Sequence, residues 1–156
     1  PLMEPVSTST FRWSQRQSFF PVQIENSFLS AKKAGATILI VEDEILMLRL
    51  LVRFFTRHGY HVLQAADGEQ EVDIYRRQET EIDVVLLDIL LPNKTGAQVF
   101  REMKVVNPAV KVVVASGYLD PQIKADMSMA GIKRFVDKPY ILDDVRDVVE
   151  SMLASD

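Results

Sequence analysis

The chain has 156 residues, of which 47% are hydrophobic and 26% are charged, a composition typical of one globular domain rather than of a disordered or fibrous protein. It has no cysteine and only two histidines, His58 and His61, which excludes disulfide frameworks and thiolate zinc sites and disfavours a multi-histidine metal site. A net charge of −4 does not suit a general nucleic-acid binder, and no apolar run approaches the roughly 20 residues that span a bilayer. We therefore expect a cytoplasmic protein with no direct nucleic-acid or membrane partner.

Residues 1–36 differ in composition from the rest of the chain. They are rich in serine, carry four basic and two acidic side chains, and show no apolar periodicity, whereas the remainder is acidic. We predict a tail or linker over 1–36 and a globular domain over 37–156. Because the first segment also contains five aromatic residues, two alternatives to a free tail stay open: it packs on this domain or on a second copy, or it belongs to a neighbouring domain.

From Thr37 onwards, short apolar runs alternate with helical patterns. Continuous apolar runs of this length are typical of strands that are covered on both faces. The predicted strands are 37–41, 61–63, 82–87, 110–115 and 134–136.

Five helical patterns separate and follow these strands. The first has Ile45, Leu48, Val52 and Phe55 on one stripe and ends at Gly59. The second begins after the capping residue Asp67 and turns Val72 and Tyr75 inward, and the third covers 97–106. The fourth begins at Asp120-Pro121, with Ile123, Met127 and Ala130 as its buried stripe, and the fifth is lined by Leu142, Val145, Val149 and Met152.

Alternating strands and helices predict an α/β fold, a doubly wound five-stranded parallel sheet with five helices. In such sheets ligands bind beyond the carboxyl ends of the strands, so the residues that follow each strand decide function. Those residues here carry oxygen and nitrogen groups: Glu42, Asp43 and Glu44 after the first strand, Asp88 after the third, Ser116 after the fourth and Lys138 after the fifth.

Carboxylates crowded at one edge repel one another unless a cation lies between them, and Mg²⁺ suits a site with a few carboxylates and several waters. A lysine and a hydroxyl opposite them could bind phosphoryl oxygens. An aspartate is a competent nucleophile and forms an acyl phosphate, so the set predicts phosphoryl transfer onto a carboxylate.

Several segments together resemble the receiver domain of two-component response regulators over residues 37–154. They are Val41-Glu-Asp-Glu44, Tyr60-His-Val-Leu-Gln-Ala-Ala-Asp-Gly68, Leu87-Asp-Ile-Leu-Leu-Pro92 followed by Gly96, Ala115-Ser-Gly117 and Asp137-Lys-Pro139. The resemblance implies the flavodoxin-like strand order 2-1-3-4-5 and makes 37–156 a receiver domain.

Residue roles also follow from the resemblance. It implies that Asp88 accepts a phosphoryl group from a histidine kinase or phosphotransfer protein, and that Ser116 and Lys138 bind that group. Phe135 takes the position of the aromatic switch residue, coupled to Ser116. Glu42, Asp43, Asp88 and the backbone carbonyl of Leu90 are the implied Mg²⁺ ligands. An unidentified downstream protein is expected on the face formed by the fourth helix, fifth strand and fifth helix, and a homodimer remains open.

Two departures from the family pattern affect these expectations. Glu42 stands where aspartate is commoner, and its longer arm suggests contact with the metal through a water. Phe135 stands where tyrosine is frequent, so its rotation breaks no hydroxyl hydrogen bond. Leu90 and Tyr118 are bulky neighbours of the site, and we expect them to obstruct the water that hydrolyses the acyl phosphate.

Other functions fit the residues less well. A haloacid-dehalogenase-type phosphatase needs a second aspartate where Leu90 stands, a flavin-binding module would place phosphate against Glu42-Asp43-Glu44, and no P-loop motif is present. A phosphorylation-independent pseudo-receiver is disfavoured because Asp43, Asp88 and Lys138 are all present. We favour a stand-alone receiver that is not itself an enzyme, with the C-terminal receiver of a hybrid histidine kinase as the alternative.

Overall fold

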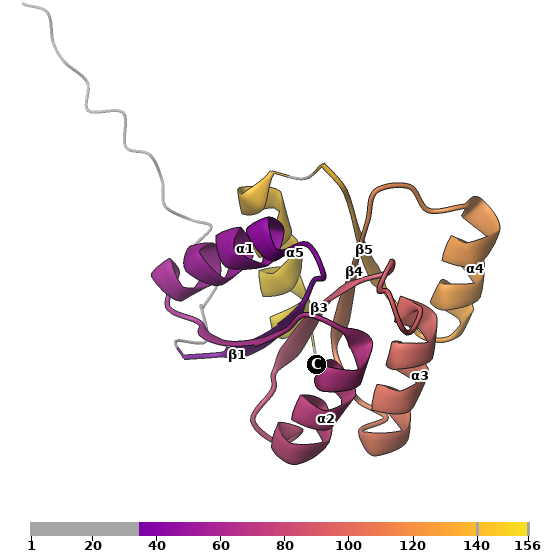
Figure 1. The fold of residues 1–156 in the computed structure, drawn as a ribbon, viewed down its shortest axis with the longest axis horizontal. Coiled ribbons are helices and arrows are strands. Elements are labelled where there is room, and N and C mark those ends of the chain that lie inside the picture. The colour runs from indigo at the N-terminus through magenta and orange to yellow at the C-terminus, as the bar shows by residue number, and fades with distance from the viewer. Residues whose placement is uncertain (1–34, 140, 156) are drawn as a thin grey trace, which may run out of the picture.

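The computed structural model describes residues 35–139 and 141–155 as alternating strands and helices around one parallel sheet (Figure 1). The strand order is β2-β1-β3-β4-β5, which confirms the doubly wound fold and its order. The elements are β1 (Thr37–Val41), α1 (Ile45–Arg57), β2 (His61–Ala65), α2 (Gly68–Gln78), β3 (Val84–Asp88), α3 (Gly96–Val106), β4 (Val112–Ser116), α4 (Pro121–Met129), β5 (Arg134–Asp137) and α5 (Leu142–Leu153).

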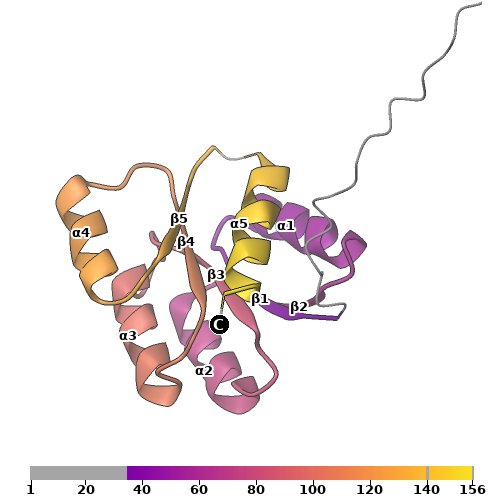
Figure 2. The same cartoon turned by 180° about the vertical axis from the view of Figure 1, so that it is seen from behind.

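Two helical layers cover the two faces of the sheet. Helices α1 and α5 lie on one face, and α2, α3 and α4 lie on the other (Figures 1 and 2). Alternate residues of each strand enter opposite layers: Ile38 and Ile40 pack with α1 and α5, whereas Leu39 and Val41 pack with the other helices. The three central strands β1, β3 and β4 are therefore buried almost throughout, which explains why their sequences are continuously apolar.

The register of the strands aligns their carboxyl ends. Val41 pairs with Leu87, Asp88 with Ala115, and Ser116 with Asp137, all in parallel. Residues that follow these strands therefore lie at a common edge of the sheet, as the sequence predicts. Within the described residues, none of the helices combines the length and apolarity that crossing a bilayer requires.

Helix starts follow local capping chemistry. The Asp67 side chain accepts hydrogen bonds from the backbone N–H groups of Glu69 and Gln70, and Asp120 accepts one from Gln122, which confirms both predicted caps. Helix α3 begins with a capping box, not predicted from the sequence, in which Thr95 and Gln98 exchange hydrogen bonds.

Two predicted core residues are exposed. Ile45 is 49% exposed because it is the first residue of α1 and lies beyond the sheet, and Leu51 is buried in its layer instead. Ile123 is 48% exposed because the short helix α4 faces the core mainly through Met127.

The limits of two strands differ from the predicted ones: β3 ends at Asp88 rather than at 87, and β4 begins at Val112 rather than at 110. The predicted tail lies outside the described residues up to 34, and Ala36, at its end, is buried.

A carboxyl group is buried where α2 packs on α3. Glu71 has no exposed surface, and neither of its side-chain oxygens has a hydrogen-bond partner among the described residues. Burial is the largest cause that raises the pKa of Glu71 to about 8, with the negative charge of Glu102 adding to it and the positive charge of Lys94 opposing it. The folded protein therefore favours the protonated, uncharged form of this side chain.

The substitution Glu71→Gln should stabilise the protein at neutral pH. Because the pKa is about 8 in the folded state and 4.5 in the reference state, the folded protein binds more protons, and stability falls as pH rises between these values. Removing this ionisation should increase the free energy of unfolding by about 3 kcal/mol at pH 7. Urea unfolding between pH 5 and pH 8 measures it, with Glu69→Gln, an exposed glutamate of the same helix, as the control. Parallel pH profiles for the variant and the unsubstituted protein would contradict the assignment.

Candidate functional site

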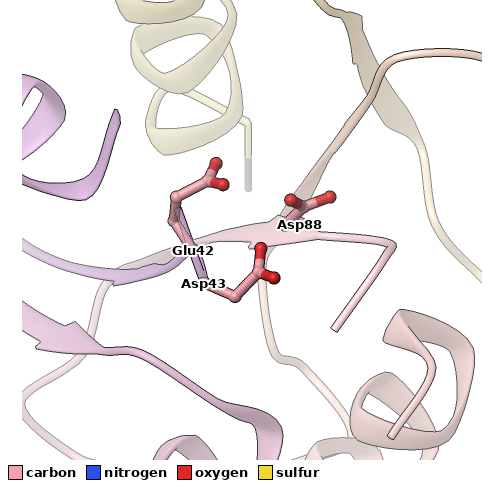
Figure 3. Close-up of side chains that lie close together, drawn as sticks. All are labelled: Glu42, Asp43 and Asp88. Atoms are coloured by element: carbon pink, nitrogen blue, oxygen red, sulfur yellow. The ribbon is translucent and has the colours of Figure 1, made fainter. Parts of the chain in front are cut away.

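Three carboxylates converge beyond the carboxyl ends of β1 and β3 (Figure 3). Glu42 and Asp43 directly follow β1, and Asp88 is the last residue of β3. One oxygen of each lies within 4.8 Å of the others, a spacing that allows all three to contact one cation. Glu42 and Asp88 are 2% and 6% exposed, whereas Asp43 is open to solvent, so a ligand can enter from its side.

The amine of Lys138 neutralises the two buried carboxylates. Its Nζ donates hydrogen bonds to Glu42 Oε2 at 2.6 Å and to Asp88 Oδ2 at 2.7 Å. Burial by itself lowers the pKa of Lys138, but the hydrogen bonds and negative charges of Asp88 and Glu42 outweigh it and raise the pKa overall. Burial also raises the pKa of Glu42, although the hydrogen bond from Lys138 opposes this effect. The ammonium thus occupies the position between the carboxylates that a crowded anionic site requires.

The second oxygen of Asp88 is held by the loop that follows β3. The backbone N–H of Leu90 donates to Asp88 Oδ1 at 3.1 Å, and Leu90 forms an isolated antiparallel bridge with Thr95. The loop then passes very close to the start of α3: a Cβ atom at Gly96 would lie 2.9 Å from Ile89 Cα and 3.1 Å from Asp88 O. Glycine at 96 therefore lets α3 approach the Asp88 backbone, a structural role beyond its place in the sequence motif.

Ser116 carries a buried hydroxyl at the same edge. The residue is 3% exposed, and its Oγ has no hydrogen-bond partner among the described residues. Its backbone carbonyl accepts a hydrogen bond from the N–H of Lys138 at 2.6 Å, so the two predicted phosphoryl-binding residues are adjacent. Leaving a buried hydroxyl unsatisfied costs about 1–3 kcal/mol, which suits a group that serves a ligand. The next residue, Gly117, leaves open space where a side chain would stand.

The remaining predicted residues surround this centre. Phe135 lies on β5, is half-buried against the α2–α3–α4 layer, and has the Nζ of Lys124 5.2 Å from its ring centroid. Leu90 and Tyr118 are 71% and 82% exposed, so both are free to lie over an occupant of the site. Two supporting groups have no role predicted from the sequence: Gly96, and the backbone N–H of Glu44, which donates to Glu42 Oε1 at 3.4 Å.

The arrangement has the groups that phosphoryl transfer to a carboxylate requires. Glu42, Asp43 and Asp88 offer hard oxygen ligands for a divalent cation such as Mg²⁺. Lys138 and Ser116 offer a charged and a neutral donor beside the Asp88 carboxylate. Donors of this kind stabilise the charge that spreads over the equatorial oxygens of a transferring phosphoryl group.

Replacing Lys138 by alanine should destabilise the protein in metal-free buffer, because it leaves the buried carboxylates of Glu42 and Asp88 without their cation. We expect a loss of about 2 kcal/mol in the free energy of unfolding, below the range for fully buried pairs since the lysine side chain is 20% exposed. Chemical denaturation measures it. Lys133→Ala, an exposed lysine, is the control, and the double variant Lys138→Ala/Asp88→Asn should recover part of the loss. Equal stability of Lys138→Ala and the control would show that the amine contributes nothing here.

Comparison of the chain with protein families and with known proteins identifies similar receiver domains. The family model described as response regulator receiver domain matches residues 38–150. Sporulation initiation phosphotransferase F of Bacillus subtilis is 32% identical over 116 residues, which are 74% of this chain and 92% of that protein. The sensor kinase CckA of Brucella abortus is 30% identical over 119 residues, which are 76% of this chain and 13% of the kinase.

Solved structures with the same architecture include two that bear on the site. CheY of Borrelia burgdorferi, in a complex with CheX, BeF₃ and Mg²⁺, has a TM-score of 0.73 and 29% identity, with 77% of this chain and 90% of that chain covered. The receiver domain of the sensor histidine kinase PA1611 from Pseudomonas aeruginosa, with magnesium in its active-site cleft, has a TM-score of 0.70 and 25% identity, with 78% and 100% covered.

Proposed function

The chain belongs to the response regulator receiver family, and on that premise we propose that Asp88 is its phosphoacceptor. The observation that carries the proposal is the set of contacts around this carboxylate. One oxygen of Asp88 accepts a hydrogen bond from the ammonium of Lys138, and the other accepts one from the backbone N–H of Leu90. The Ser116 hydroxyl, which has no partner among the described residues, lies at the same edge of the sheet. These groups leave Asp88 oriented and surround it with donors for a phosphoryl group.

In the proposed reaction a carboxylate oxygen of Asp88 attacks the phosphorus of a phosphohistidine on a histidine kinase or phosphotransfer protein. The new O–P bond forms as the N–P bond breaks, and the imidazole leaves with the bonding electron pair. Glu42, Asp43, Asp88 and the Leu90 carbonyl would hold Mg²⁺, which supplies charge neutralisation between the carboxylates and the phosphoryl oxygens. The Lys138 ammonium and the Ser116 hydroxyl would donate to those oxygens.

Phosphorylation would change the partners of two residues. Lys138 would exchange part of its contact with Asp88 for a phosphoryl oxygen, and Ser116 would satisfy its buried hydroxyl. Movement of Ser116 would let the Phe135 side chain turn inward. This rotation would break the contact between its ring and the Lys124 ammonium. Because Lys124 is on α4 and Phe135 on β5, we propose the α4–β5–α5 face as the surface that contacts a downstream protein or a second copy.

The proposed chemistry is compatible with two arrangements: a receiver that is a separate protein, and a receiver that is part of a histidine kinase. The matched phosphotransferase is nearly covered by the chain, whereas the matched sensor kinase is covered over 13% of its length. A receiver that stands alone passes its signal by contact with another protein, and one attached to a kinase receives its phosphoryl group from that polypeptide. Both placements use the same chemistry at Asp88.

Incubation with Mg²⁺ and acetyl phosphate should add the mass of one phosphoryl group to the intact protein. Asp88→Asn should abolish the addition because the acceptor oxygen is lost, and a chelator or Asp43→Asn should suppress it because the cation is lost. Asp73→Asn, an exposed aspartate on α2, serves as the control and should react normally. Intact-mass spectrometry measures it, and a phosphoryl adduct that persists in Asp88→Asn would rule out this acceptor.

Leu90→Asn should shorten the lifetime of the acyl phosphate. The exposed Leu90 side chain is free to cover the site, and an amide in its place would admit and orient a water. We expect hydrolysis to be roughly threefold to tenfold faster, an effect of about 1 kcal/mol. The decay of the phosphorylated mass after removal of the donor measures it. Val105→Asn, which replaces another exposed apolar residue, on α3, is the control, and identical decay of both variants would remove the screening role.

A further inference from the structure

A second cavity lies at the opposite end of the sheet from Asp88. It has a volume of about 470 Å³ and opens where the loops before β4 and β5 meet the ends of α3 and α5. Figure 1 shows these loops at the end of the sheet away from the loops that follow β4 and β5. A volume of this size falls within the roughly 300–1,000 Å³ of small-molecule sites.

The lining of this cavity is strongly basic. Lys104, Lys111, Lys133 and Arg134 all contribute to it, and no acidic residue of the described ranges 35–139 and 141–155 does. Within the described part of the chain, no carboxylate oxygen lies within salt-bridge distance of any of these four cations, whereas Lys94, Lys138 and Arg146 are all paired. Four cations without a carboxylate partner among the described residues thus face one cavity, in a protein whose net charge is −4.

Two of the cations are fixed in place by helix ends. Lys104 Nζ donates to Ala130 O at 3.1 Å, at the end of α4, and Lys111 Nζ donates to Ser155 O, just after α5. Carbonyl partners orient an ammonium but leave its charge uncompensated, and each ammonium has three donors, so donors remain for a ligand.

The space around Lys104 depends on a glycine. Gly131 has a φ of +110°, and a Cβ atom there would lie 2.8 Å from Lys104 Nζ. The backbone conformation therefore favours glycine, and the missing side chain leaves room for the flexible amine of Lys104. Lys104 and Lys111 are thus oriented before any ligand arrives, which lowers the entropic cost of binding for these two side chains.

We propose that this cavity binds a compact polyanion, a compound with two or three linked phosphate groups. Several cations in one concave site match several adjacent negative charges better than a single one. Pro108, Val112 and Met152 give the cavity an apolar part that a nucleobase could cover, so a nucleoside polyphosphate and a free polyphosphate share the required chemistry. The site is separate from Asp88 and does not depend on phosphorylation.

Titration of the full chain in metal-free buffer tests the proposal, with calorimetry for affinity and amide chemical shifts for location. Tripolyphosphate should bind saturably, shift residues 104–112 and 131–134, and bind about tenfold tighter than orthophosphate or sulfate. Adenosine diphosphate binding tighter than pyrophosphate would assign the apolar part to a nucleobase. Equal affinities would assign the site to free polyphosphate, and either result supports the proposal.

The double variant Lys133→Glu/Arg134→Glu should weaken tripolyphosphate binding about tenfold or more, because two exposed cations become anions. Arg49→Glu/Arg53→Glu on α1 makes the same change in net charge away from the cavity and should leave the affinity nearly unchanged. Equal weakening by both pairs, shifts at the Asp88 edge, orthophosphate binding as tight as tripolyphosphate, or no saturable binding would each overturn the proposal. If the variant does not fold, the location of the amide chemical-shift changes in the unsubstituted protein shows whether tripolyphosphate binds in this cavity.

Discussion

The Lys138 ammonium between Glu42 and Asp88 is the interaction on which the functional edge of the sheet depends. Two carboxylates that are 2% and 6% exposed could not both remain charged there without a cation close by. The lysine directly follows β5 and reaches Asp88 at the end of β3 and Glu42 after β1, and its own backbone N–H donates to the carbonyl of Ser116. A single residue thus connects the outermost strand with the carboxylates that follow β1 and β3.

The arrangement of the sheet makes this connection possible. Parallel pairing in one register brings the ends of β1, β3, β4 and β5 to the same edge, and two helical layers keep the central strands dry and rigid. Groups placed on such strand ends keep their relative positions because neighbouring strands share hydrogen bonds. The chemistry therefore lies in short loops, and the rest of the chain holds those loops in place.

Much of the fold and of the site can be predicted from the sequence. The fold follows from the spacing of apolar residues, and the site from the positions directly after the predicted strands. Continuous apolar runs marked β1, β3 and β4, and the residues directly after them contained Glu42, Asp88 and Ser116. What escaped prediction depends on neighbours that are distant in sequence. Neither the burial of Glu71 beneath α3 nor the exposure of Ile123 follows from the period of its own helix, and the second Lys138 contact, with Glu42, requires knowing the side-chain geometry.

The double contact of Lys138 has a consequence for any divalent cation that enters this edge. Such an ion does not meet free carboxylates, because an ammonium already competes for Glu42 and Asp88. Its apparent binding free energy is therefore the free energy of coordination by the carboxylates minus the free energy of the Lys138 ion pairs that it disrupts. The side chain that we propose to bind the phosphoryl group thus also influences the concentration at which the ion can enter.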